Sequence, residues 1–166
     1  MKKIIVISAI TLFLMLCSNV MQAQNSHKNL NQAELLRKYI GVWKAEVGKD
    51  TTNWFEFAAY GENALTGNFK MKVKDKIIFQ NKQLWGYDSK ANKIIGVELE
   101  RDSGMMILYI CGFVSENVLE GVAIRNITHP EIVSEKFYEE FKSPDMYIQN
   151  FTENNQKISI TFKRIK

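Results

Sequence analysis

Carboxylates on apolar segments are the groups in this 166-residue chain that could perform acid–base chemistry. Glu98 and Glu100 stand two residues apart, so they share one face of a strand, and we expect that face to be solvated. Glu139 instead lies between two phenylalanines on its own face, which predicts an inward carboxylate. Such a group needs a partner, for example Arg125 or a bound ligand, because an unpaired buried charge is costly.

Nucleophilic and metal chemistry need groups of histidines or cysteines that the sequence does not provide. The two histidines are His27 near the N-terminus and His129 in a Thr-His-Pro turn. Beyond Cys17 the only cysteine is Cys111, which alternates with large apolar residues on one strand face and is therefore expected to be buried and inert. The sequence thus predicts no catalytic residue, no metal site and no cofactor.

Aromatic side chains are the other candidate functional groups, since they recur at alternate positions along apolar segments. In a barrel they could fill the core or line a pocket, and the pattern leaves both possibilities open. The set is Trp54, Phe57, Tyr60, Phe79, Trp85, Tyr109, Phe113, Phe137 and Tyr147. The predicted ligand-binding residues are Phe57, Trp85, Tyr109, Phe113, Arg125, Phe137, Glu139 and Tyr147.

The elements that position these residues are one short helix followed by about ten strands. Apolar residues at helical spacing predict a helix over residues 30–40, with Asn31 and Glu34 as a capping pair and Gly41 at its end. Alternation then continues to the C-terminus. It predicts strands over residues 42–48, 53–60, 65–74, 77–87, 93–101, 104–114, 117–126, 132–142, 145–153 and 157–165.

The connections between these strands are short and rich in Gly, Asn, Asp and Ser. Strands joined by tight turns pair as antiparallel neighbours, because a parallel crossover needs a dozen or more residues. The sequence therefore predicts an all-β fold, a single antiparallel up-and-down barrel, whose closure removes exposed edges. Two sandwiched sheets are the structural alternative.

The first residues have the pattern of a secretory signal peptide, with two lysines, an apolar run over residues 4–16 and a small-residue exit. We expect residues 1–23 to be a signal peptide cleaved after Ala23, residues 24–29 a disordered leader and residues 30–166 the barrel domain. The protein would be exported to the periplasm or medium. Lipid anchoring through Cys17 is the alternative, although Leu16 directly before the cysteine fits that processing badly.

Charge and hydropathy limit the partners of this domain. Without Lys2 and Lys3, 20 basic residues face 18 acidic ones. That balance predicts no nucleic-acid partner, and no later segment is apolar enough to predict an integral membrane span. The oligomeric state does not follow from the sequence.

A helix leading into Gly41-Val42-Trp43, followed by a meander with Gly86-Tyr87-Asp88, resembles the calycin superfamily of lipocalins, fatty-acid-binding proteins and nitrobindin-like barrels. It is most similar to small exported bacterial lipocalin-like domains. The resemblance implies that Trp43 packs across the closed end of the barrel as a structural residue, beneath Lys163 or Arg164. Nitrobindin-like barrels bind haem through a late histidine, and His129 does not lie within a strand as that role would require.

The resemblance implies a carrier or sensor that binds a small, mostly apolar molecule inside the barrel. Some relatives in this superfamily isomerise or cyclise apolar substrates, and in an enzyme of that kind Glu139, Arg125 and Tyr109 would be the groups to test. A filled barrel that acts as a structural or interaction protein is the third possibility.

Overall fold

The alternation of apolar and polar residues produces ten antiparallel strands in the computed structural model, which describes residues 30–74, 76–153 and 156–166. The predicted signal peptide and leader lie outside the described residues. Each strand begins and ends within three residues of its predicted bounds. The strands are β1 (Gly41–Val47), β2 (Thr51–Ala59), β3 (Ala64–Val73), β4 (Lys76–Asp88), β5 (Lys93–Glu100), β6 (Met106–Ser115), β7 (Val118–Ile124), β8 (Glu135–Ser143), β9 (Met146–Glu153) and β10 (Gln156–Arg164).

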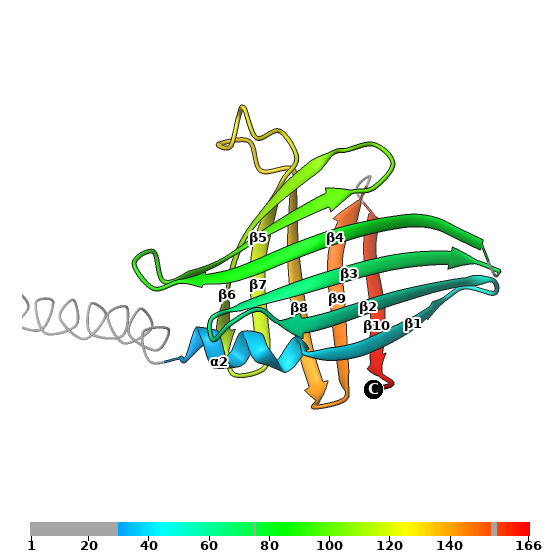
Figure 1. The fold of residues 1–166 in the computed structure, drawn as a ribbon, viewed down its shortest axis with the longest axis horizontal. Coiled ribbons are helices and arrows are strands. Elements are labelled where there is room, and N and C mark those ends of the chain that lie inside the picture. Colours follow the sequence, from blue (N-terminus) through cyan, green and yellow to red (C-terminus); the bar gives the residue numbers. More distant parts are fainter. Residues whose placement is uncertain (1–29, 75, 154–155) are drawn as a thin grey trace, which may run out of the picture. The chain divides into compact units, whose positions relative to one another are not determined.

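The unit formed by residues Asn31–Lys166 is a closed barrel in which every strand pairs with its neighbour in sequence. Closure comes from β1 and β10, where Trp43 is opposite Arg164 and Lys44 is opposite Lys163. In Figure 1 the strands β1 to β4 cross in front of β8, β9 and β10. The up-and-down barrel is therefore confirmed, and the alternative of two sandwiched sheets is wrong.

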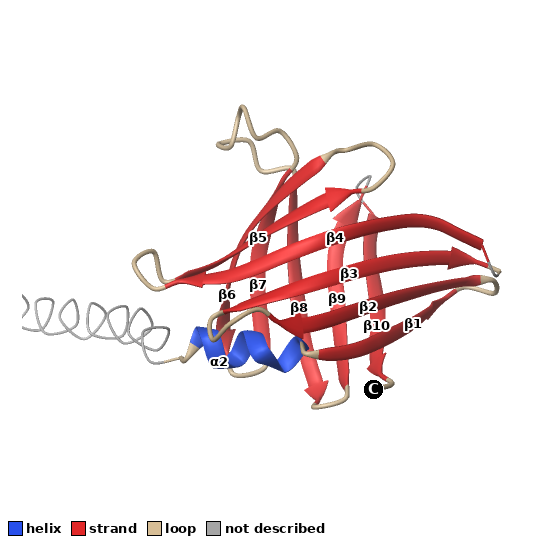
Figure 2. Ribbon diagram, viewed as in Figure 1, coloured by secondary structure: helices blue, strands red, loops and turns tan. Residues whose placement is uncertain are grey.

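The helix before β1 is shorter than predicted. It consists of α2 (Gln32–Leu36) and a 3₁₀ turn, η2 (Arg37–Tyr39), and Figure 2 shows it at one end of the barrel. The capping prediction is confirmed, since the backbone N–H of Glu34 donates to Asn31 Oδ1 at 3.1 Å. Leu35 and Leu36 are buried.

A side chain also fastens this helix to the barrel wall. Gln32 is buried, its Nε2 donates to the carbonyl of Phe113 at 2.9 Å, and its Oε1 accepts from the backbone N–H of Phe113 at 2.7 Å. Both bonds satisfy backbone groups where the register of β6 and β7 shifts between Phe113 and Ser115. The helix therefore covers this end of the barrel in a fixed position.

Trp43 closes the helix end of the barrel. Its side chain is fully buried, and its indole N–H donates to the carbonyl of Tyr39 at 2.7 Å. The residue before the Val-Trp pair, Gly41, has a φ of +132°, and a Cβ there would lie 2.6 Å from Arg164 Nη1. Glycine at this position thus provides both the backbone conformation and the space that the guanidinium occupies.

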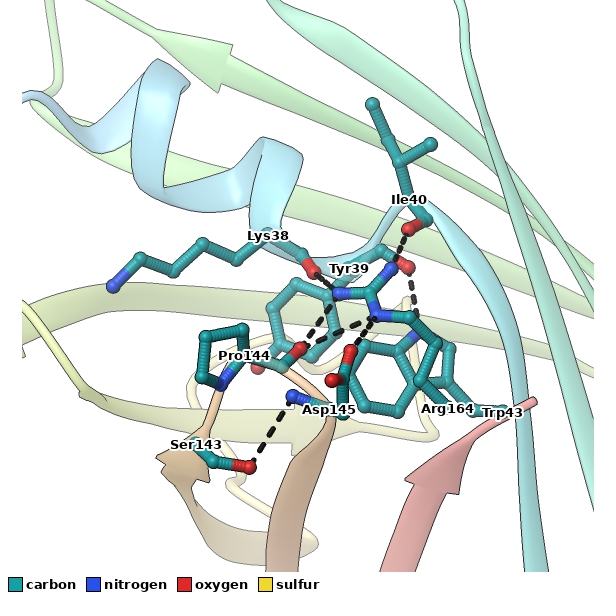
Figure 3. A network of polar contacts seen from close by, with 8 residues as sticks. All are labelled: Lys38, Tyr39, Ile40, Trp43, Ser143, Pro144, Asp145 and Arg164. Carbon is teal, nitrogen blue, oxygen red and sulfur yellow. Dashed lines mark hydrogen bonds and ion pairs between the residues drawn. The ribbon is translucent and has the colours of Figure 1, made fainter. Parts of the chain in front are cut away.

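The Arg164 side chain bonds the end of the helical segment to the loop between β8 and β9 (Figure 3). Its guanidinium donates to the carbonyls of Ile40, Lys38 and Pro144, the latter two at 2.9 Å from Nη2, and its Nε lies 3.1 Å from Asp145 Oδ1. It also lies over the Trp43 ring. Of the two basic residues considered from sequence, the one above the tryptophan is therefore Arg164.

Two residues of the aromatic set that was expected inside the barrel, Trp54 and Tyr60, lie outside it. Trp54 faces outward from β2, with the ammonium groups of Lys44 and Lys72 at 5.4 and 5.7 Å from its ring centre. Tyr60 follows β2 and is 64% exposed. Trp54 is at an even position of β2, whereas Phe55 and Phe57 at odd positions point inward, so the alternation itself separates them.

Candidate functional site

The barrel encloses a cavity of about 260 Å³. Side chains from β2 to β10 line it, and Leu36 and Tyr39 of the helical segment form part of its floor. Most of the lining is apolar and aromatic, with Phe55, Phe57 and Phe69 on one wall and Phe137 and Phe151 on another. The interior is therefore not completely filled, as the width of a ten-strand barrel permits.

The structure brings most of the predicted ligand-binding residues together at this cavity. Those that line it are Phe57, Trp85, Tyr109, Arg125, Phe137, Glu139 and Tyr147. Phe113 does not line it. That ring is 2% exposed and packs against Tyr39, with 6.5 Å between ring centroids, toward the helix end of the barrel.

Three lining aromatic rings each lie over a glycine directly opposite on the neighbouring strand. The cross-strand pairs are Phe57 with Gly67, Trp85 with Gly96, and Phe137 with Gly121. A Cβ at these glycines would lie 2.8 Å from Phe57 Cε1, 2.5 Å from Trp85 Cζ3 and 2.6 Å from Phe137 Cζ. Because each ring occupies the place of a missing side chain, it lies against the wall and leaves the lumen open.

The first polar cluster of the cavity is centred on Glu98 of β5. Gln83 Nε2 donates to Glu98 Oε2 at 2.9 Å, and the Tyr109 hydroxyl donates to the same oxygen at 3.0 Å. The indole N–H of Trp85 donates in turn to Gln83 Oε1 at 2.9 Å. The prediction that Glu98 lies on a solvated outer face is therefore wrong, since its side chain is 6% exposed and points into the barrel.

Burial changes the acidity of this cluster. The pKa of Glu98 is raised, mainly because burial disfavours the charged carboxylate, while hydrogen bonds from Tyr109, Gln83 and Asn81 oppose that effect. Burial, together with the charge and hydrogen bond of Glu98, also raises the pKa of the Tyr109 hydroxyl far above its usual range. The hydroxyl is therefore a hydrogen-bond donor at physiological pH.

The second polar cluster is centred on Glu139 of β8, which is inward and buried as predicted. The Tyr39 hydroxyl donates to Glu139 Oε2, and Gln149 Nε2 donates to Glu139 Oε1 at 2.7 Å. Burial raises the pKa of Glu139, and these two hydrogen bonds counteract it. Of the partners considered from the sequence, Arg125 does not pair with Glu139, whose two carboxylate oxygens accept from Tyr39 and Gln149.

Arg125 follows β7 near the rim of the cavity. Its guanidinium lies 3.5 Å from the carboxylate of Glu135, and the Arg125 side chain is 46% exposed. His129 lies in the exposed connection between β7 and β8, 3.2 Å from Glu131. Cys111 is buried, and burial raises the pKa of its thiol far above the usual range, which favours the unreactive thiol.

Sequence reasoning did not assign Tyr39, Asn53, Asn81, Gln83 or Gln149 to the site. The sequence did contain a signal for Asn81 and Gln83, because they continue the alternation of Phe79 and Trp85 along β4 and so share their inward face. Polar residues on an otherwise apolar face of a strand indicate an interior that hydrogen-bonds to something. Gln149 carried the same signal, because it alternates with Tyr147 and Phe151 along β9, but its pairing with Glu139 depends on the register of β8 and β9.

The arrangement can hold a small molecule by its apolar body and orient it by hydrogen bonds at fixed places on the wall. No group of three or more metal-ligating side chains occurs among the described residues. Within the same part of the chain, no helix has the length and apolar character needed to cross a membrane.

Comparison with known proteins adds no relationship to these geometric findings. No protein-family model matches the chain, and no curated protein matches it in sequence. The ten-stranded barrel with one short helix is compatible with a calycin-like fold.

Proposed function

We propose that this protein binds a small, mostly apolar molecule inside its barrel and acts as a carrier or sensor in the cell envelope. The observation that carries the proposal is a cavity of about 260 Å³ with mainly apolar and aromatic walls, in which three of the rings pack against glycines on the neighbouring strand. Ligand sites are typically concave, mainly apolar and furnished with a few fixed polar groups. The Glu98 and Glu139 clusters are such polar groups.

The envelope location rests on the N-terminal residues, whose order of lysines, apolar run and small residues is typical of a secretory signal. A carrier or sensor outside the cytoplasm has to shield an apolar molecule from water. A closed barrel with a capped end and an apolar lumen is suited to that task.

The test is a fluorescence titration of the purified protein with N-phenyl-1-naphthylamine, a neutral apolar probe. Trp85→Ala removes a ring that lines the cavity and should weaken probe binding about tenfold, which corresponds to about 1.4 kcal/mol. Trp54→Ala is the matched control, because the same residue type there faces outward. Equal affinity of both variants and the unmodified protein, or no saturable binding at all, would contradict the proposal.

Acid–base catalysis on an apolar substrate is the second candidate. The observation that favours it is a buried carboxyl group of raised pKa, Glu98, hydrogen-bonded to Tyr109 in the cavity. An enzyme would convert the molecule recovered from the barrel, whereas a carrier would release it unchanged. Mass spectrometry of extracted material before and after incubation with fresh protein separates the two.

A further inference from the structure

Two side-chain oxygens inside the barrel are buried without a hydrogen-bond partner. They are Oδ1 of Asn53 and Oδ1 of Asn81, both on side chains that line the cavity and are 3% exposed. A buried acceptor without a donor costs free energy, so each one needs an explanation. Among the described residues the third such atom is the indole nitrogen of Trp54, which lies outside the cavity.

The orientation of Asn81 is set by its neighbour. Its side chain lowers the pKa of the Glu98 carboxyl group, which is the effect of an amide N–H pointing toward that group. The amide oxygen is then the atom left over. Asn81 therefore carries an unpaired buried acceptor on a side chain that lines the cavity.

The polar groups occupy one region of the wall. Asn81 and Gln83 are two residues apart on β4 and share its inward face, and Glu98 is directly opposite Gln83 on β5. Asn53 is on β2, with only β3 between it and β4. On β3 the side chains at this level, Phe69 and Met71, are apolar, so the acceptors are set in apolar surroundings.

The charges near the cavity disfavour an anionic ligand. Two buried carboxyl groups, Glu98 and Glu139, line it, and Arg125 is the one cationic side chain among the described lining residues. That guanidinium is at the rim and faces the carboxylate of Glu135. A ligand carboxylate would therefore enter beside acceptor oxygens and buried acids with no free cation to pair with.

We infer that Asn53, Asn81 and Glu98 form the recognition site for the polar end of the ligand, and that the ligand is an uncharged apolar molecule ending in a hydrogen-bond donor, such as an alcohol. The inference rests on the proposed function and specifies its ligand class. An O–H group on the ligand satisfies an acceptor that the protein leaves unpaired, while the apolar body lies against the aromatic walls.

The experiment compares ligands that differ only at the polar end. 1-Decanol, 1-methoxydecane and decanoate are used to displace N-phenyl-1-naphthylamine from the purified protein at pH 7.5. The ether keeps the oxygen but lacks the donor. We expect the alcohol to bind about five- to tenfold more tightly than the ether, the size expected of one hydrogen bond, and decanoate to bind more weakly than the alcohol.

Variants identify the groups responsible. Asn81→Leu and Asn53→Leu each replace an amide by an apolar group of similar shape, and each should reduce the preference for the alcohol over the ether. Because Asn53→Leu removes an unpaired acceptor, its melting temperature should stay unchanged or rise, whereas Asn81→Leu also removes the amide N–H beside Glu98. Asn150→Leu is the matched control, because this asparagine of β9 lies outside the cavity lining, and it should leave the preference intact.

The outcomes separate this inference from the proposed function. Equal affinity of the alcohol and the ether, with the apolar probe still bound, overturns donor recognition and leaves apolar binding standing. Failure of the probe and of all three decyl ligands to bind overturns both. A lower melting temperature of Asn53→Leu with an unchanged alcohol preference shows that internal water satisfies its oxygen, and this too overturns the inference. The comparison of ligands on the unmodified protein needs no variant to fold.

Discussion

The guanidinium carbon of Arg164 lies 4.2 Å from the centre of the Trp43 ring, within the range of a cation–π contact. The two residues are also direct partners where β10 pairs with β1 and closes the barrel. The contact therefore connects the first and last strands at the end covered by the helix. It is part of the structural frame and is separate from the cavity lining.

Trp43→Ala should reduce the free energy of unfolding by about 3–5 kcal/mol, because it removes a fully buried ring and leaves a cavity. Affinity for N-phenyl-1-naphthylamine should change little under conditions in which the variant is folded. Urea denaturation and the probe titration measure the two quantities. A variant of normal stability that no longer binds the probe would mean that the ligand enters at the helix end.

Arg164→Ala should reduce stability by about 2–3 kcal/mol, since the carbonyls of Lys38 and Ile40 lose a charged donor and Trp43 loses its cation. Arg164→Lys should restore less than half of that loss, because an ammonium group cannot reproduce the planar fork that reaches several carbonyls at once. Urea denaturation of both variants checks this. Full rescue by lysine would show that charge alone matters at this position.

The faces of β4 and β5 show which part of the fold could be predicted from the sequence and which could not. Alternation predicted both strands, but it does not say which face is inside. On β5 the outward residues include Leu99, which is 48% exposed, whereas the inward residues are Ile94, Gly96 and Glu98. The outer face of β5 is thus the more apolar one. The rule that the apolar face of a strand points into the core therefore placed Glu98 on the wrong face.

Tyr39 illustrates a contact that no local pattern can predict. It is one of the apolar residues whose spacing predicted the helix, and its ring packs between Phe57, Phe141 and Tyr147. Its hydroxyl, however, bonds to Glu139, 100 residues further along the chain. That pairing depends on where the helix comes to lie across the barrel end, which follows from the closed fold and not from the helix sequence.

Gly96→Ala should weaken probe binding about tenfold and reduce stability by about 1–3 kcal/mol, because the new methyl group would force the Trp85 ring away from the wall and into the lumen. Gly86→Ala is the matched control. A Cβ at Gly86 has no neighbour nearer than 3.9 Å, so both quantities should change little. A probe titration and a melting curve on both variants decide the matter, and equal effects would refute the role of glycine in keeping the lumen open.

Cleavage after Ala23 should produce a mature chain that begins at Gln24 and is recovered without detergent. N-terminal sequencing of protein isolated from an exporting host measures this directly. An acylated Cys17 at the N-terminus would replace the soluble carrier by a membrane-anchored one.

Glu98 should make stability depend on pH in a defined direction. Its pKa is raised in the folded protein because of burial, so the folded state holds the proton more tightly than the unfolded state. The stabilisation from the protonated side chain is fully present below the unfolded pKa of about 4.3 and is lost as the pH rises through the higher folded value. Above that value the chain must bury a charged carboxylate.

Glu98→Gln keeps the shape of the side chain and removes this titration. The stability of Glu98→Gln relative to the unmodified protein should therefore increase as the pH is raised from 4 to 8. Urea denaturation of both proteins at several pH values measures the difference, and comparing the pair cancels the contribution of Glu139, whose pKa is also raised by burial. A difference that is constant over this range, or that decreases with pH, would mean that Glu98 is as well solvated or as well paired when charged as it is in the unfolded chain. The acceptor site argued from Asn53 and Asn81 would then have a charged carboxylate beside it at neutral pH.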